Sequence, residues 1–158
     1  MRKLSLIVAT ALLAMGGALV SSGVSHAATQ GADLAANGIV AGGETSTERS
    51  HLIVFVLTLT NKGPIGSGAS ADLVLTDLQG GTLLDTMCVL PNGFGINPDT
   101  PSCEFGPLRA KQSVQATYVV QPSDTSTSVS LRACTNNEGS VPDPVASNNC
   151  TALAVAIV

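Results

Sequence analysis

The chain has 158 residues and a formal net charge of −4, from seven basic and eleven acidic side chains. It contains four cysteines but only three phenylalanines, one tyrosine and no tryptophan. Nucleic acid is excluded as an expected partner, because the few cations are scattered among acidic residues and form no basic stripe.

The N-terminal residues have the three successive parts of a secretory signal peptide. The basic start MRK precedes the apolar run LSLIVATALLAMGGALV, and the small residues of VSHA follow. We predict cleavage after Ala27, because glycines and serines end the apolar run too early for a membrane anchor. Taking 27 residues from 158 leaves a mature chain of 131, the size of one domain. We expect this mature chain to be secreted, extracellular and without a membrane span.

Cleavage also changes the charge of the chain. It removes two cations, which leaves five basic against eleven acidic side chains and a formal charge of −6. Residues 28–50 are mainly Ala, Gly, Thr, Ser and charged residues, with Ile39 and Val40 as a short apolar pair. A segment of this composition buries little surface, so we predict a flexible lead-in with room for one short edge strand.

From residue 51 onward, apolar runs rich in β-branched residues alternate with clusters of turn residues. The first run, HLIVFVLTLT, stops at the turn signal NKGP. No segment after the signal peptide has a helical period over three turns. The runs that predict strands are 51–60, 69–78, 82–90, 103–105, 113–121, 128–134 and 150–158. About seven short strands with almost no helix predict an all-β, antiparallel sandwich over residues 51–158.

The four cysteines form an even set suited to two disulfides in an exported chain, and their spacings do not match a zinc site. Strand alternation places Cys134 and Cys150 on outward faces, where they would lie opposite each other if their strands form a hairpin. Proximity in the chain favours this pair together with Cys88–Cys103, although four cysteines permit three connectivities. Each closed loop is expected to contribute about 3 kcal/mol of stability.

Four short motifs in order resemble the domain-of-unknown-function 11 family, a bacterial conserved repeat with an immunoglobulin-like sandwich. The matching residues are Asn61, Gly63 and Pro64; Asp77; Leu108; and Asp143, Pro144, Asn148 and Asn149. The resemblance covers about residues 50–158 and implies an exported surface module without a defined catalytic activity. One position departs from the pattern, because Lys111 stands where the family usually has a turn glycine. It must therefore form a different turn or accept a positive φ.

The sequence offers little catalytic chemistry. His51 is the one histidine after the signal peptide, and no Gly-x-Ser-x-Gly motif accompanies it, so we interpret it as an exposed strand-end residue. We predict no enzyme activity, no cofactor and no metal. A calcium site in the loop 136–149 stays open as an alternative to turn capping. Its oxygen ligands would come from Glu138, Asp143, Asn148 and Asn149.

Two residues are candidates for binding: Phe94, an exposed aromatic in the loop PNGFGINPDTP, and Asp143. The partner itself is not identified, and a cell-envelope or extracellular protein is the class we expect. We predict a secreted, non-catalytic module with a structural or adhesive role at the bacterial cell exterior. The alternative is an extracellular small-molecule carrier. It rests on analogy with the chromoprotein apoproteins of actinomycetes, which share small size, acidity, two disulfides and a sandwich fold.

Overall fold

The structure, a computed structural model, describes residues 30–42, 52–68, 70–90, 93–96, 101–137 and 141–157. The predicted signal peptide and His51 lie outside these residues. The described residues form nine strands and one 3₁₀ turn: β1 Leu34–Gly42, β2 Ile53–Asn61, β3 Ala71–Gln79, β4 Gly81–Leu90, β5 Gly93–Ile96, β6 Ser102–Glu104, β7 Ser113–Pro122, β8 Ser128–Asn137, η1 Ala146–Asn148 and β9 Cys150–Ala156. None of these elements is a helix long and apolar enough to cross a membrane.

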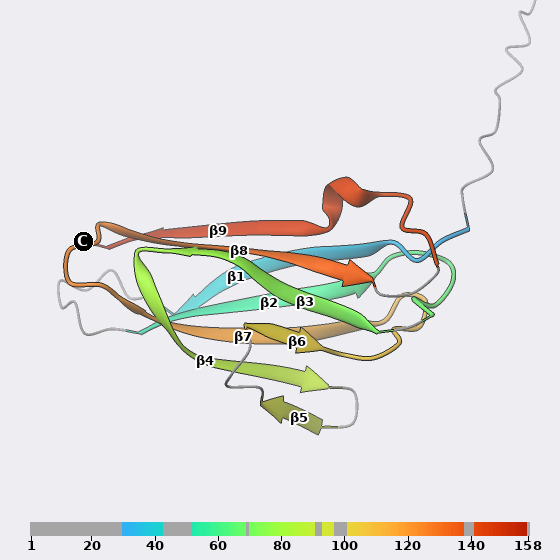
Figure 1. The fold of residues 1–158 in the computed structure, drawn as a ribbon, viewed down its shortest axis with the longest axis horizontal. Helices are drawn as coiled ribbons and strands as arrows, with labels where there is room; N and C mark the ends of the chain where they lie inside the picture. Colours follow the sequence, from blue (N-terminus) through green and yellow to red (C-terminus); the bar gives the residue numbers. More distant parts are fainter. Residues whose placement is uncertain are drawn as a thin grey trace, which may run out of the picture.

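The strands form two antiparallel sheets that face each other (Figure 1). A five-stranded sheet has the order β1-β2-β7-β4-β5, and a four-stranded sheet has the order β6-β3-β8-β9. The fold is thus an immunoglobulin-like β-sandwich, as predicted, and each of the seven predicted strands is present. The chain crosses from one sheet to the other between β3 and β4, where Gly80 alone separates the two strands.

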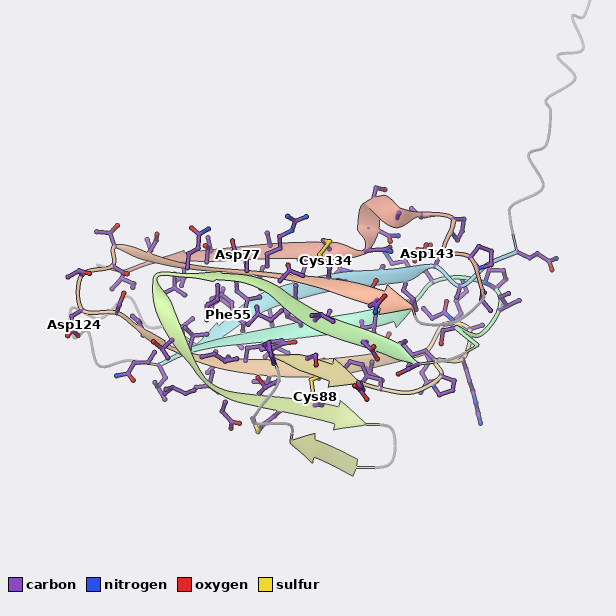
Figure 2. The ribbon with its side chains drawn as sticks, viewed as in Figure 1. Phe55, Asp77, Cys88, Asp124, Cys134 and Asp143 are labelled. Atoms are coloured by element: carbon purple, nitrogen blue, oxygen red, sulfur yellow. A yellow bond between two sulfur atoms is a disulfide. The ribbon has the colours of Figure 1, made fainter. Side chains whose placement is uncertain are left out.

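The core lies between the sheets and follows the alternation of the sequence. Along β2, buried and half-buried residues alternate without a break, and Phe55 points into the interior (Figure 2). In β8 the predicted outward position of Cys134 requires the alternate residues to point inward, and Val129, Leu131 and Ala133 are all buried. Tyr118 on β7 donates its hydroxyl to the carbonyl oxygen of Leu73 at 3.3 Å. Burial raises the pKa of this phenol.

Strand β1 corrects the prediction for the lead-in. Nine of the residues assigned to it, Leu34–Gly42, form a full strand that pairs with β2 along its length. The prediction left room for a short edge strand here, and β1 is an edge strand, but it is longer than expected and its first residues are buried, because a strand of small residues needs few large apolar side chains. At Gly38, a Cβ atom would lie 2.2 Å from Leu57 Cδ2 and 2.8 Å from Leu153 Cδ1, so core side chains already fill the space. The first part of the strand, Leu34, Ala35 and Ala36, is buried, whereas Ile39 is exposed.

Lys111 occupies the position where the sequence departs from the family pattern, and the structure shows which of the two predicted conformations it adopts. Its φ is 65°, and among the described residues it is the one non-glycine with a positive φ. The turn is held by the Lys111 amide, which donates to Asn61 O at 2.8 Å, and by the Lys111 ammonium, which donates to Lys62 O. The second of the two predicted solutions, a positive φ, is therefore the one adopted.

This conformation leads to a prediction about stability. Lys111→Gly is expected to leave the free energy of unfolding unchanged or raise it by up to about 1 kcal/mol, because glycine carries no steric cost in the left-handed region. Lys111→Val should lower it by about 1–2 kcal/mol, because a β-branched side chain is strained there. Urea unfolding of the two variants measures the difference. Equal midpoints for the glycine and valine variants would show that the turn carries no strain.

Candidate binding surfaces

Asp143 lies at the end of the sandwich opposite Asp124 (Figure 2). Its Oδ2 accepts a hydrogen bond from the Leu34 amide at 3.1 Å, and its Oδ1 accepts one from the Val145 amide at 2.9 Å. Both oxygens thus serve the backbone, one across the two sheets and one within its own turn. This gives Asp143 a structural role in fixing the start of β1, while its binding role stays a prediction.

The two asparagines of the same motif differ from the expectation that they satisfy turn backbone groups. The Asn148 amide donates to the carboxylate of Asp33 at 2.7 Å, so its partner is a side chain. The Oδ1 atoms of Asn148 and Asn149 are buried and accept no hydrogen bond within the described part of the chain. In that same part, no group of three or more His, Cys, Asp or Glu residues could hold a metal ion. Glu138, the fourth residue of the calcium alternative, lies outside it.

Phe94 belongs to a strand and not to the loop predicted for it. Its backbone lies in β5, where it pairs opposite Val89 of β4. The sequence prediction missed this strand because two of its four residues are glycines, which weaken strands and resemble a turn. The Phe94 side chain lies outside the described residues, so its candidacy for binding stays a prediction.

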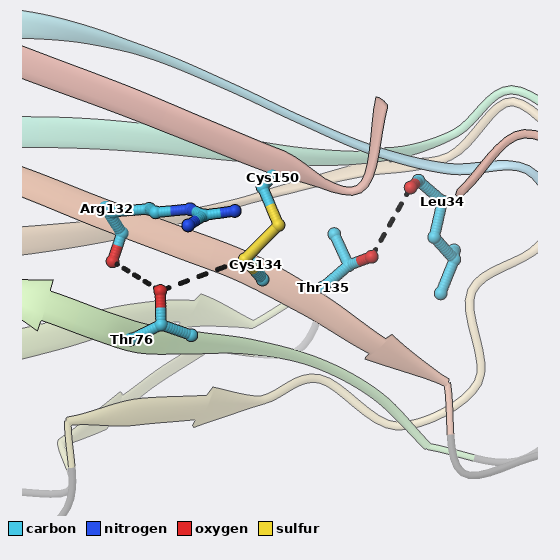
Figure 3. Close-up of a disulfide and its surroundings, with 6 residues drawn as sticks. All are labelled: Leu34, Thr76, Arg132, Cys134, Thr135 and Cys150. Atoms are coloured by element: carbon cyan, nitrogen blue, oxygen red, sulfur yellow. Dashed lines mark hydrogen bonds between the residues drawn. A yellow bond between two sulfur atoms is a disulfide. The ribbon is translucent and has the colours of Figure 1, made fainter. Parts of the chain in front are cut away.

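The two disulfides have the predicted pairing and very different surroundings. Cys88–Cys103 joins β4 of one sheet to β6 of the other, and both residues are buried. Cys134–Cys150 joins neighbouring strands of the same sheet at positions directly opposite each other. Both of its cysteines are half-buried on the outer face, where Thr76 Oγ1 lies 3.8 Å from Cys134 Sγ (Figure 3).

This difference predicts the order in which the disulfides are reduced. Under native conditions a phosphine reductant should open Cys134–Cys150 first, because attack needs access to sulfur. Cys88–Cys103 should react only when the sandwich opens. Mass spectrometry after pulse alkylation at successive times identifies the free thiols. Alkylated Cys88 and Cys103 appearing at the same rate as the other pair would contradict the prediction.

The outer face of the four-stranded sheet has a shallow depression of about 230 Å³. Its lining consists of small and apolar residues with one charge of each sign: Asp77, Ser130, Leu131, Arg132, Ala152, Leu153 and Ala154. The Asp77 carboxylate accepts a hydrogen bond from Gln79 Nε2 at 2.9 Å. This face is therefore polar and charged at its centre.

The outer face of the five-stranded sheet has the opposite character. We use the term outer apolar face for five residues that share it: Ile39 on β1, Val54 and Val56 on β2, Val119 on β7 and Met87 on β4. The exposed fraction is 62% for Ile39 and 36% for Met87. The three valines are half-buried.

Strand register sets these side chains in rows across the sheet. Ile39 pairs with Val56, Val56 with Thr117, and Thr117 with Met87, which gives one row over four strands. The next row contains Val54, which pairs with Val119, and Asp85, which also pairs with Val119. Asp85 is the one charged residue among the described side chains that these strands turn outward. A face of this kind is available for contact with an uncharged, apolar surface.

No protein-family model and no curated protein matches this chain. Among solved structures, it is similar to the CARDB domain of the PF1109 protein from Pyrococcus furiosus. The crystal structure of that domain, in complex with di-metal ions, is 14% identical, with a TM-score of 0.50 over 82% of this chain and 96% of that chain. Its solution NMR structure is 15% identical, with a TM-score of 0.51 over 82% of this chain and 97% of that chain. The likeness concerns the fold alone, and the resemblance to the domain-of-unknown-function 11 family stays a prediction.

Proposed function

We propose that this chain is a secreted, non-catalytic immunoglobulin-like module of the bacterial cell exterior, related to the domain-of-unknown-function 11 family, and that it acts by binding. Export is supported by the two disulfides, which persist in oxidising compartments. The observation that carries the binding role is the outer apolar face. Outward-facing sheet positions in a sandwich are ordinarily polar. Here a row of four outward residues has three apolar members, the exposed Ile39 and Met87 and the half-buried Val56, with Thr117 as its one polar member.

The carrier alternative is less well supported. Pockets for small organic ligands usually have volumes of roughly 300–1,000 Å³ and enclose most of the ligand. The depression beside Arg132 has a volume of about 230 Å³ and lies open on a sheet face. Surface contact with a macromolecule is therefore the function we propose.

Affinity capture tests this function. The secreted protein, immobilised with its disulfides intact, is used as bait for culture supernatant and solubilised cell envelope. Ile39→Lys should reduce the captured material by about tenfold, because a charge on an apolar contact costs about 1–2 kcal/mol or more. Ala156→Lys, at an exposed position on the other sheet and outside the depression, is the matched control and should not change capture. Loss of capture in Phe94→Ala but not in Ile39→Lys would place the contact on the β4–β5 hairpin instead.

A further inference from the structure

We infer that a second copy of this chain docks on the outer apolar face, so that two sandwiches pack face to face as a homodimer. The inference rests on the proposed function, since it uses the same face and names its partner. It is carried by three properties of that face: the distribution of charge, the strand register and the area.

The charge distribution selects a partner of the same kind. After cleavage of the predicted signal peptide, each copy has five basic and eleven acidic side chains, so two copies repel each other over most approaches. Asp85 lies beside the outer apolar face and is the one charged residue among the described side chains that these strands turn outward. The face offers no opposite charge to a strongly acidic partner, and it offers a strongly basic partner only this one carboxylate. An uncharged apolar surface fits, and the face itself is such a surface.

The register makes the face complementary to itself. A two-fold axis parallel to the strands, between β2 and β7, places the row that begins at Ile39 over the same row of the other copy. Ile39 then lies over the second copy's Met87, and Val56 lies over its Thr117. In the next row Val54 lies over Val119, and Asp85 lies over the backbone of Gly42. The two Asp85 carboxylates are therefore kept apart. Face-to-face packing of aligned sheets is a usual arrangement of β-structure.

The area indicates an association that depends on concentration. Face-to-face packing covers the whole outer surface of β1, β2, β7 and β4, of which the outer apolar face is one part. Four strands about 4.8 Å apart, with about eight residues each at about 3.3 Å per residue, give this whole surface an area of roughly 500 Å² per copy. The total of roughly 1,000 Å² lies just below the usual range of about 1,200–2,000 Å² for stable interfaces. The expected species is a reversible dimer in exchange with the monomer.

Sedimentation velocity of the secreted protein over a range of concentrations tests the inference. The wild-type chain should shift from monomer to dimer as its concentration rises. Ile39→Lys and Met87→Glu, each at an exposed position, should raise the dissociation constant at least about tenfold. Combined in one chain, the two changes place each new lysine over a new glutamate, so dimerisation should return to within about threefold of wild type. Ala156→Lys, at an exposed position on β9 of the other sheet, is the control, and circular dichroism verifies the fold of each variant.

The outcomes separate this inference from the proposed function. A wild-type chain that stays monomeric at every concentration overturns the dimer, as does a dimer insensitive to both single changes. Failure of the double variant to recover overturns the pairing of Ile39 with Met87. If the chain is monomeric but Ile39→Lys still abolishes capture of envelope material, the dimer is wrong and the proposed function stands. If the chain is dimeric but Ile39→Lys leaves the capture of envelope material unchanged, the dimer stands and the proposed binding function is wrong.

Discussion

Replacing Gly80 with alanine is expected to lower the free energy of unfolding by about 3–5 kcal/mol. Gly80 has a φ of 77°, which already costs an alanine about 1 kcal/mol. An added Cβ would also lie 2.0 Å from the carbonyl oxygen of Ser128, and backbone cannot move aside as a flexible side chain does. The Gly80 carbonyl accepts a hydrogen bond from the Ser123 amide at 3.0 Å, so displacing the turn breaks a second contact. Urea unfolding followed by circular dichroism measures the loss.

Gly106→Ala is a matched control for the steric part of this cost. Gly106 has a similar φ of 69°, but no heavy atom lies within 4 Å of the position its Cβ would occupy. Its replacement should therefore cost only about 1 kcal/mol, the backbone penalty alone. The difference between the two variants isolates the close approach of Gly80 to Ser128 at the crossing between the sheets. If both variants lose the same stability, the crossing tolerates a side chain and this account of it is wrong.

The fold could be predicted wherever the side chains alternate strongly. The run at residues 53–59 places large apolar residues at every second position, and the strand it predicts is present as β2. The position of β1, predicted only as a possible short edge strand, and that of β5, which was not predicted, depend on neighbouring strands. Gly38 lets β1 lie against Leu57 and Leu153, where a side chain would clash, and β5 pairs with β4 through its backbone. Neither reason is visible in a local pattern of hydrophobicity.

Only part of the outer apolar face could be predicted from the sequence. The run HLIVFVLTLT is apolar at Val54 and Val56 as well as at the buried positions, which indicates a strand with apolar residues on both faces. Which side chains lie beside them depends on the order β1-β2-β7-β4 and its register. Ile39 and Met87 lie in the same row although they are 48 positions apart in the sequence. No local motif predicts that residues with this sequence separation share a row. Long-range pairing of this kind is decided by the packed fold.

Asn61→Ala is expected to cost about 2–4 kcal/mol, because this one side chain holds the turn after β2. Asn61 is fully buried, and its amide donates to the carbonyl oxygens of Ile65 at 2.8 Å and Leu108 at 3.2 Å. Its Oδ1 accepts from the Gly63 amide at 3.0 Å. Alanine removes all three bonds and leaves the Gly63 amide buried without a partner, which is the costlier part of the change. The resemblance marked Asn61 as a motif position, and these contacts supply its physical reason.

Two further variants test whether the loss of stability in Asn61→Ala comes from its hydrogen bonds. Replacing an asparagine elsewhere should not cause the same loss. Asn61→Asp keeps an acceptor for Gly63 but directs a charged oxygen at two carbonyl groups in a buried site. At neutral pH it should therefore destabilise the chain at least as much as alanine. Asn37→Ala, at an exposed position on β1, should change the free energy of unfolding by no more than about 0.5 kcal/mol. Thermal and urea unfolding give all three values. An Asn61→Ala variant as stable as Asn37→Ala would mean that the turn is held by its backbone alone, through the bond from the Lys111 amide to Asn61 O.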